Sequence, residues 1–311
     1  MVIRPIEHGI FASAGGVPDV GAGYVAGGAA PTMVDTVDKF GFPSGSRTTL
    51  ATGMSFASQQ VFGMANNGVA GYTGGGQSGG TYPTTVDKFA FSDDGRTTLG
   101  TGLSAAGQGP GLANSGTAGY VALGNSAGTR VATVDKFAFS DDGRSTLGTG
   151  LSSARSTAVG FANSGTAGYV AAGYATARVD TVDKFAFSDD SRTTLGTGLP
   201  AARSAASGFA NSGTAGYVGG GFAPGMVDSV VKLTFSTDGI ATLATGLSAA
   251  RYGMAGFANS GVSGYFAGGN DASTLTTVDE FAFSDDSRTT LGTGLATATR
   301  YCAGFANSES L

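Results

Sequence analysis

Pairs of adjacent aspartates are the side chains in this sequence best suited to acid–base chemistry. Convergent carboxylates with shifted pKa values can act as general acid and base. Each pair, however, follows a serine and lies just before an arginine, in a short segment where aspartate commonly bonds its own backbone in a turn. One such turn also offers fewer than the six oxygen ligands that Ca²⁺ requires. We therefore expect turns at Asp93/Asp94, Asp141/Asp142, Asp189/Asp190 and Asp285/Asp286.

Other catalytic or metal-binding groups are scarce. The only histidine is His8 and the only cysteine is Cys302. A Ser-His-Asp or Cys-His relay needs a histidine beside its nucleophile, and a structural zinc site needs several Cys or His ligands. The Gly-Gly pairs lack the Lys-Ser/Thr that completes a phosphate-binding loop. We expect no catalytic residue, no metal and no cofactor, and we interpret Cys302 as a small buried hydrophobic residue.

The aspartate pairs belong to a repeat that fills most of the chain. Near copies of Val-Asp-Lys-Phe-Ala-Phe-Ser-Asp-Asp recur at spacings of 48 or 49 residues. Their first aspartates are Asp38, Asp87, Asp135, Asp183 and Asp279, and Val231 takes this place in a degraded copy. Self-similarity at this period indicates a solenoid, an array or a propeller.

Each unit divides into four short strands without helical periodicity. They are typified by Ser204–Ala210, Gly216–Gly221, Thr181–Phe187 and Thr193–Leu199. Turn clusters of Asn, Ser, Asp and Gly separate the strands. This pattern predicts an all-β fold, a six-bladed β-propeller with four-stranded antiparallel blades. The first strand is rich in small residues, so we place it innermost.

The two ends of the repeat predict how the ring closes. The first unit begins at its second strand, near Gly23, and the chain finishes with an unattached first strand, Arg300–Asn307. We expect the C-terminal strand to join the N-terminal blade. Residues 22–311 would then form the propeller and residues 1–21 an N-terminal arm, through which an oligomer could form.

The second strand resembles the kelch repeat. It reads Tyr-x-x-Gly-Gly from Tyr24, Tyr72, Tyr217 and Tyr265, and in weakened form from Tyr120 and Tyr169. An arginine before the first strand and an aromatic residue in the third strand also sit where a kelch unit has them. Leucine replaces the fourth-strand tryptophan of kelch repeats, for example Leu195. The resemblance implies a propeller that binds other proteins.

Two looser resemblances suggest alternative functions. Ser92–Leu99 is similar to the Asp box of sialidase-type propellers, although its glycine comes one place early and its tryptophan is missing. The Gly/Ser/Thr-rich, near-duplicate units are reminiscent of bacteriophage virion proteins. The alternatives are thus a virion adhesin or assembly protein, a sialidase-like glycan-processing or glycan-binding protein, and a cytosolic kelch-type adaptor.

Comparison of the six units locates a candidate binding face. The Asn-Ser-Gly and Ser-Asp-Asp turns hardly change, whereas the loop between the second and third strands differs every time. This loop lies at the same end of a blade as the connection to the next blade. We take Arg155, Arg203, Arg251, Arg130, Arg178, Tyr174 and Asp271 at this end as candidate ligand-binding residues. Neutral drift of exposed loops explains the variation equally well.

The fifth unit lacks both the third-strand aspartate and the turn arginine, which are Val231 and Ile240 there. The joint loss suggests an ion pair. In the intact units, however, the two residues stand nine positions apart at opposite ends of the third strand, at about 3.3 Å per residue. We therefore expect no such pair.

Composition narrows the choice of partners. Only 13% of residues are charged, the net charge is −5 and there is no basic run, so we expect no nucleic acid partner. No apolar stretch is long enough to span a bilayer. Met1–Pro5 does not open a secretory signal, so we expect synthesis in the cytoplasm, with a virion as a further location. The predicted function is a non-catalytic binding or structural module whose partners are other proteins of an assembly or a surface glycan.

Overall fold

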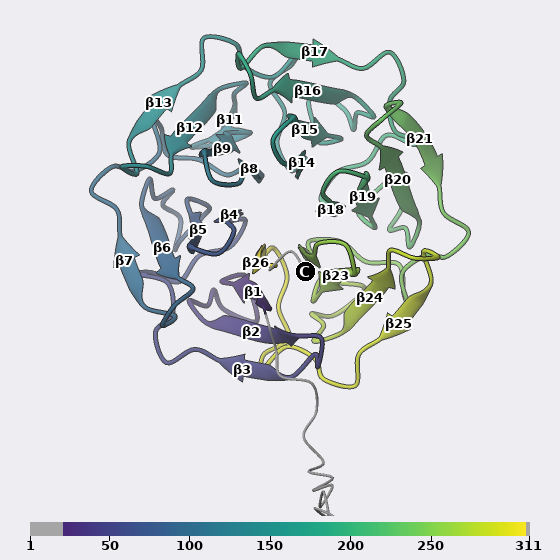
Figure 1. The fold of residues 1–311 in the computed structure, drawn as a ribbon, viewed down its shortest axis with the longest axis horizontal. Coiled ribbons are helices and arrows are strands. Elements are labelled where there is room, and N and C mark those ends of the chain that lie inside the picture. Colours follow the sequence, from purple (N-terminus) through teal and green to yellow (C-terminus); the bar gives the residue numbers. More distant parts are fainter. Residues whose placement is uncertain (1–20, 309–311) are drawn as a thin grey trace, which may run out of the picture.

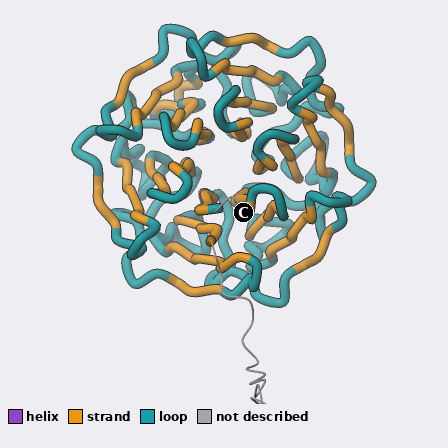
Figure 2. The backbone as a smooth tube through the Cα atoms, viewed as in Figure 1, coloured by secondary structure: helices purple, strands orange, loops and turns teal. Residues whose placement is uncertain are grey.

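The computed structural model describes residues 21–308 and confirms the six-bladed propeller. Six four-stranded antiparallel sheets stand around a central axis (Figure 1). Strands and loops alternate around the whole ring (Figure 2). The described part of the chain contains no helix, and so none that could cross a membrane.

Within each blade the strands are ordered from the axis outwards. Blade 1 has β26 (Ala303–Asn307), β1 (Gly21–Ala26), β2 (Val37–Phe42) and β3 (Arg47–Thr49). Blade 2 has β4 (Phe62–Asn66), β5 (Ala70–Gly74), β6 (Val86–Ala90) and β7 (Arg96–Thr98). Blade 3 has β8 (Gly111–Asn114), β9 (Ala118–Ala122), β12 (Val134–Ala138) and β13 (Arg144–Thr146), with a small hairpin of β10 (Asn125–Ser126) and β11 (Thr129–Arg130).

Blades 4 to 6 repeat the same order. Blade 4 has β14 (Val159–Asn163), β15 (Ala167–Ala171), β16 (Val182–Ala186) and β17 (Arg192–Thr194). Blade 5 has β18 (Ser207–Asn211), β19 (Ala215–Gly219), β20 (Val230–Thr234) and β21 (Gly239–Thr242). Blade 6 has β22 (Ala255–Asn259), β23 (Ser263–Ala267), β24 (Val278–Ala282) and β25 (Arg288–Thr290). The outermost strands are shorter than the sequence predicts.

The C-terminal strand closes the ring, as predicted. Strand β26 pairs with β1 in antiparallel register, from Ala22 opposite Asn307 to Ala26 opposite Ala303. Blade 1 therefore takes its innermost strand from the end of the chain. Closure in this way pairs the inner edge of β1, which would otherwise be left open beside the axis. The proposed arm falls almost entirely on residues 1–20, which lie outside the described residues.

The core lies between neighbouring blades. On β14, Phe161 packs against Gly216 of the next blade, where a Cβ atom would collide with its ring. The glycine before each second-strand tyrosine thus makes room for a side chain of the preceding blade. Phe185 is buried in the same kind of inter-blade cluster. The aromatic residue of the third strand therefore contributes to the core between blades.

A polar contact repeats between successive blades. On β9, the Tyr120 hydroxyl donates to Asp190 of the next blade at 2.7 Å, and Lys136 pairs with the same carboxylate at 2.7 Å. Burial raises the pKa of these tyrosines, and the neighbouring aspartate raises it further. Five blade junctions carry this contact. Their members are Tyr24/Lys39/Asp94, Tyr72/Lys88/Asp142, Tyr120/Lys136/Asp190, Tyr169/Lys184/Asp238 and Tyr217/Lys232/Asp286.

The junction between blades 6 and 1 differs from the other five. Gly45 stands where the other blades have the contacting aspartate, and Glu280 replaces the lysine. Tyr265 donates instead to Glu280 of its own blade at 3.0 Å. The stacking common to all junctions is kept, because Phe42 packs on Tyr265 with ring centroids 5.4 Å apart. This junction therefore keeps its aromatic contact but has no inter-blade Tyr–Lys–Asp contact.

Candidate functional site

The two ends of the propeller have different chemistry. We call the end with the Asn-Ser-Gly and Ser-Asp-Asp turns the uniform face. The end with the loops between second and third strands, and with the connections between blades, is the varied face. The polar groups of the uniform face are largely occupied by contacts that hold the blades together.

The Asn-Ser-Gly turns connect the blades around the axis. The Asn114 Oδ1 accepts a hydrogen bond from the Gly165 amide of the next blade at 2.8 Å, and Ser164 Oγ accepts from the Ser115 amide at 3.0 Å. The same asparagine-to-glycine bond recurs at other junctions within residues 21–308. Its acceptors are Asn307, Asn66, Asn114, Asn163 and Asn211.

The aspartate pairs also have structural roles. The first member closes its own turn, as predicted: Asp93 Oδ1 accepts from the Gly95 amide at 2.9 Å. The second member, such as Asp94, has a positive φ of 56° and contacts the preceding blade. Turn chemistry alone does not predict this second role. Repetition on the uniform face is thus explained by blade packing.

The predicted ligand-binding arginines that precede the first strands lie inside the blades. Arg155 and Arg251 are fully buried, and Arg203 is 2% exposed. Arg155 donates to Asp183 at 3.0 Å and to the carbonyl oxygens of Ala172 and Val170. These candidate guanidinium groups therefore do not project from the surface of the varied face, because the side chains turn back into the sheet.

The buried ion pair shifts the pKa of both partners. Burial lowers the pKa of Arg155, and Asp183 partly opposes this. Burial alone would raise the pKa of Asp183, but hydrogen bonds from Thr194 and Ser152, together with Arg155, lower it overall. Arg251 and Asp279 form the equivalent pair at 3.0 Å in blade 6.

The third-strand aspartate also pairs with the turn arginine, contrary to expectation. Arg192 Nη1 lies 3.4 Å from Asp183 Oδ1, and four other blades have the same pair at 3.5 to 3.8 Å. The expectation was based on the distance between the aspartate and the arginine along a single extended strand. The hairpin instead folds β17 back beside β16, with Arg192 opposite Phe185, so the long arginine side chain reaches Asp183.

Blade 5 replaces this ion pair with an apolar one. Val231 and Ile240 belong to one hydrophobic cluster, with Val231 opposite Thr242 and Ile240 opposite Leu233 in the hairpin. Arg203 therefore has no carboxylate partner. Its guanidinium reaches only the Gly220 carbonyl and Ser229, at 3.2 to 3.3 Å, and its Nε has no hydrogen-bond partner. Burial lowers the pKa of Arg203 without an opposing charge.

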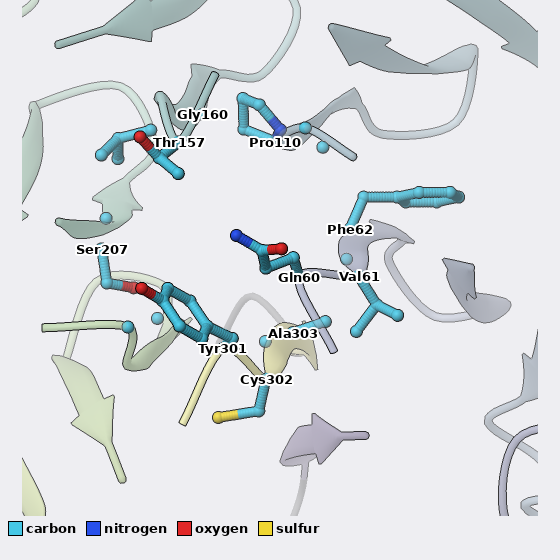
Figure 3. Close-up of a pocket in the computed structure, with 18 of the residues that line it drawn as sticks. Gln60, Val61, Phe62, Pro110, Thr157, Gly160, Ser207, Tyr301, Cys302 and Ala303 are labelled. Carbon is cyan, nitrogen blue, oxygen red and sulfur yellow. The ribbon is translucent and has the colours of Figure 1, made fainter. Parts of the chain in front are cut away.

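An axial hollow of about 130 Å³ lies where the innermost strands converge. It is lined by the residues that lead into and begin the first strand of every blade. The Gln60 side chain extends toward the middle of the hollow, with Tyr301 and Thr157 on its rim (Figure 3). None of its lining residues is Asp, Glu, Lys, Arg or His.

Backbone geometry shapes the mouth of this hollow. In five blades the residue two positions before the first strand has a positive φ, with values from 51° to 67°. They are Gln60, Thr157, Ala205, Gly253 and Tyr301. Their amides and carbonyls join neighbouring blades, for example Ala205 N to Thr157 O at 3.0 Å. In blade 3, Gly109 and Pro110 occupy this segment without a positive φ, so the mouth is not six-fold symmetric.

Aromatic and arginine side chains from successive blades meet on the varied face. Arg130 of blade 3 stacks over Tyr174 of blade 4 at 4.8 Å, and Arg178 of blade 4 stacks over Phe222 of blade 5 at 5.7 Å. Phe222 contacts Tyr252 of blade 6 with centroids 4.5 Å apart. Tyr252 in turn contacts Tyr301, and Arg300 stacks over the Tyr301 ring. We call these seven residues the aromatic–arginine arc.

The opposite side of the mouth is rich in amides. Gln59 donates through Nε2 to Gln77 Oε1 at 2.8 Å, which joins the lead-in segment of blade 2 to its loop. Gln60 and Gln108 line the hollow beside them. The varied face therefore combines a sector of stacked rings and guanidinium groups with a sector of side-chain amides.

The predicted site residues divide between these locations. Arg130, Arg178 and Tyr174 lie together in the arc. Asp271 is engaged in its own turn, where its carboxylate accepts the Ser273 amide at 3.1 Å. The sequence-based prediction omitted Phe222, Tyr252, Arg300 and Tyr301. Their signal was the presence of aromatic or charged residues at positions where most other units have small residues or uncharged amides.

No nucleophile stands out at this site. Burial raises the pKa of the Cys302 thiol to about 12, so the thiol stays protonated at neutral pH. Burial also raises the pKa of Tyr301. Within residues 21–308, no group of three or more His, Cys, Asp or Glu side chains converges as a metal site would require.

Comparison with known proteins does not assign the chain to a family. No family model matches it, and no curated protein matches it either.

Proposed function

We propose that this protein is a non-catalytic binding module that recognises a glycan through its varied face. The observation that carries the proposal is the joint presence of the aromatic–arginine arc and the glutamine sector around one hollow. Aromatic rings offer flat apolar faces with polar edges, on which the C–H face of a sugar ring can pack. Side-chain amides both donate and accept, as sugar hydroxyls do.

The contrast between the two faces supports this assignment. Polar side chains of the uniform face join blade to blade, whereas the arc residues Arg130 and Arg178 are exposed. Binding sites are commonly concave and lined by aromatic groups with a few placed polar groups. The lack of charged or histidine side chains in the lining of the hollow supports a binding role over glycan processing.

A surface assembly, such as a virion, is the setting that we propose for this module. The Gly/Ser/Thr-rich, near-duplicate repeat units motivate this proposal. Many copies on one particle would turn a weak single-site affinity into strong attachment, because each binding event raises the effective concentration for the next. Recognition of another protein is the alternative function for the same face.

A glycan array with matched variants tests the proposal. Removing the Phe222 and Tyr252 rings with F222A/Y252A should weaken glycan binding roughly 30- to 1000-fold, since each of the two rings contributes on the order of 1–2 kcal/mol. The control is V69A/V262A, which truncates two exposed apolar residues of the uniform face. Glycan binding that is lost in the control, or unchanged in F222A/Y252A, would contradict the proposal. A wild-type protein that binds no glycan would do the same.

A further inference from the structure

The positive charges of the propeller are almost all neutralised by a carboxylate partner. Each of the five lysines pairs with the turn aspartate of the next blade at 2.7 to 2.8 Å. Seven arginines pair with a third-strand aspartate. Among residues 21–308, the cations with no carboxylate within 4.0 Å are Arg130, Arg178, Arg203 and Arg300. All four belong to the loops and connections of the varied face.

This distribution is not expected from the overall charge. The chain has a net charge of −5, so carboxylates outnumber cations. Any surface arginine would gain by approaching one of them, as the arginines of the outer strands do. The arc keeps three guanidinium groups together without such a partner. An external anion would supply the missing charge.

The stacking in the arc presents these guanidinium groups for binding. Arg130 and Arg178 lie over the rings of Tyr174 and Phe222, and Arg300 lies over Tyr301 at 5.7 Å while donating to the Tyr252 hydroxyl at 2.8 Å. A ring beneath a guanidinium leaves its edge N–H groups free for a planar acceptor. Bidentate bonds to carboxylate or sulfate are among the strongest that arginine makes.

Buried Arg203 adds charge close to the same place. Val179, next to Arg178, forms a β-bridge with Arg203. The Arg203 backbone therefore lies beside the arc, and its buried guanidinium has no carboxylate to neutralise it. In a low-dielectric interior its field is screened less than that of a surface charge. The local potential at the arc is thereby made more positive than the side chains on the surface alone would make it.

We propose that the ligand of the varied face is an acidic polysaccharide, whose carboxylate or sulfate groups are held by Arg130, Arg178 and Arg300. This inference rests on the proposed glycan-binding function. The arginines come from blades 3, 4 and 1, so a chain with repeated acidic groups can meet several of them at once. Neutral rings of the same chain pack on Phe222 and Tyr252.

The surroundings favour a saccharide over a nucleic acid. Exposed Asp180 and Asp228 lie in the loops of blades 4 and 5, on the same face. The phosphates of a nucleic acid strand would be repelled by these carboxylates. The hydroxyls of an acidic polysaccharide can instead donate hydrogen bonds to them, and they also suit the side-chain amides of Gln59 and Gln77.

The test measures binding of four immobilised or labelled polymers to the full chain. They are a polyuronate, dextran sulfate, neutral dextran and oligo(dT). The test variant is R130Q/R178Q/R300Q. The control is K88Q/K136Q/K184Q, which removes the same number of positive charges away from the arc. Thermal melts establish that both variants are folded.

We expect the wild-type protein and the control to bind the polyuronate or dextran sulfate, more weakly as salt rises. R130Q/R178Q/R300Q should lose at least tenfold in affinity for the acidic polymer. Comparison of polyuronate with dextran sulfate identifies the acidic group. R130K/R178K, which keeps the charge but loses the planar fork, should bind with an intermediate affinity.

The opposite results separate the two proposals. Binding of neutral dextran alone, or equal binding by R130Q/R178Q/R300Q, would overturn the acidic ligand and leave glycan recognition standing. Equal capture of oligo(dT), lost in the same variant, would show that any polyanion suffices and would overturn the assignment to a saccharide. No binding to any of these polymers, together with an empty glycan array, would overturn both.

Discussion

Blades 4 and 5 have the same strands and the same register, but they differ in the chemistry of one buried position. In blade 4, Asp183 accepts hydrogen bonds from Arg155, Ser152 and Thr194. In blade 5, Val231 and Ile240 fill the corresponding space with apolar side chains. The backbone tolerates either solution.

The difference also shows which residues act as a set. In blade 5 the third-strand aspartate and the turn arginine are both replaced by apolar residues, so no turn arginine is left without its carboxylate. Arg203, the inner member, was kept without its partner. A buried charge that lacks a partner costs more than the pair itself contributes. Blade 5 is therefore expected to carry a destabilising residue that blade 4 does not.

The largest effect is expected from Asp183→Ala. This change leaves Arg155 buried without its carboxylate and removes the acceptor for Ser152 and Thr194. The free energy of unfolding, measured with urea, should fall by about 3–5 kcal/mol. D183V/R192I, which copies the apolar pair of blade 5, should cost less than the single change. A double variant as unstable as D183A would show that the blade 5 pair is not a transferable solution.

The next effect contrasts the two inner arginines. Arg155→Met should destabilise the protein by about 2–4 kcal/mol, because it breaks a buried pair. Arg203→Met should be neutral or stabilising by about 1–2 kcal/mol, since an apolar side chain of similar length replaces an unpaired charge. Urea midpoints of the two variants measure the contrast. Equal losses would mean that the carbonyl and Ser229 contacts satisfy Arg203 fully.

A smaller effect concerns acid. Burial alone would raise the pKa values of Asp183 and Asp279. Hydrogen bonds and the neighbouring arginines lower these pKa values overall in the folded protein. Their stabilisation is present above the unfolded value of about 3.9 and is lost as pH falls through the lowered folded values. Urea midpoints at pH 7 and pH 3 should differ less in D183N/D279N than in the wild type. V231D/I240R, which adds a carboxylate to blade 5, should increase the difference instead.

The smallest effect is expected at the half-buried Tyr–Lys–Asp contacts. Lys88→Met should cost about 0.5–1 kcal/mol, because the Lys88 and Asp142 side chains remain a quarter exposed and water screens their pair. Glu280→Met, at the junction without this contact, should change stability less than Lys88→Met. Thermal melts at low and high salt measure both. A larger loss for E280M would mean that Glu280 has a structural role of its own.

The sequence was sufficient to predict the fold but not the site. Regular spacing and turn residues imply six blades, and the unattached strand before Asn307 implies the closure. The Asp183–Arg192 pair was missed because distance along one strand ignores the return of the hairpin. Burial of Arg155 was missed because the residue precedes the first strand and was assigned to the connection between blades at the varied end. The arc joins residues from five blades, and no local pattern indicates that Arg130 lies over Tyr174.

The exceptional junction between blades 6 and 1 determines where the ring opens first. Five junctions carry the same polar contact, so thermal fluctuations separate them with similar free energies. The sixth junction has Gly45 and Glu280 in place of Asp and Lys, so we expect its separation to require less free energy. Amide hydrogen exchange should therefore be fastest, within the blade cores, along β2 and β24. A circular permutant that begins at blade 4 would have its termini away from this junction, but the ring should still open first at this junction.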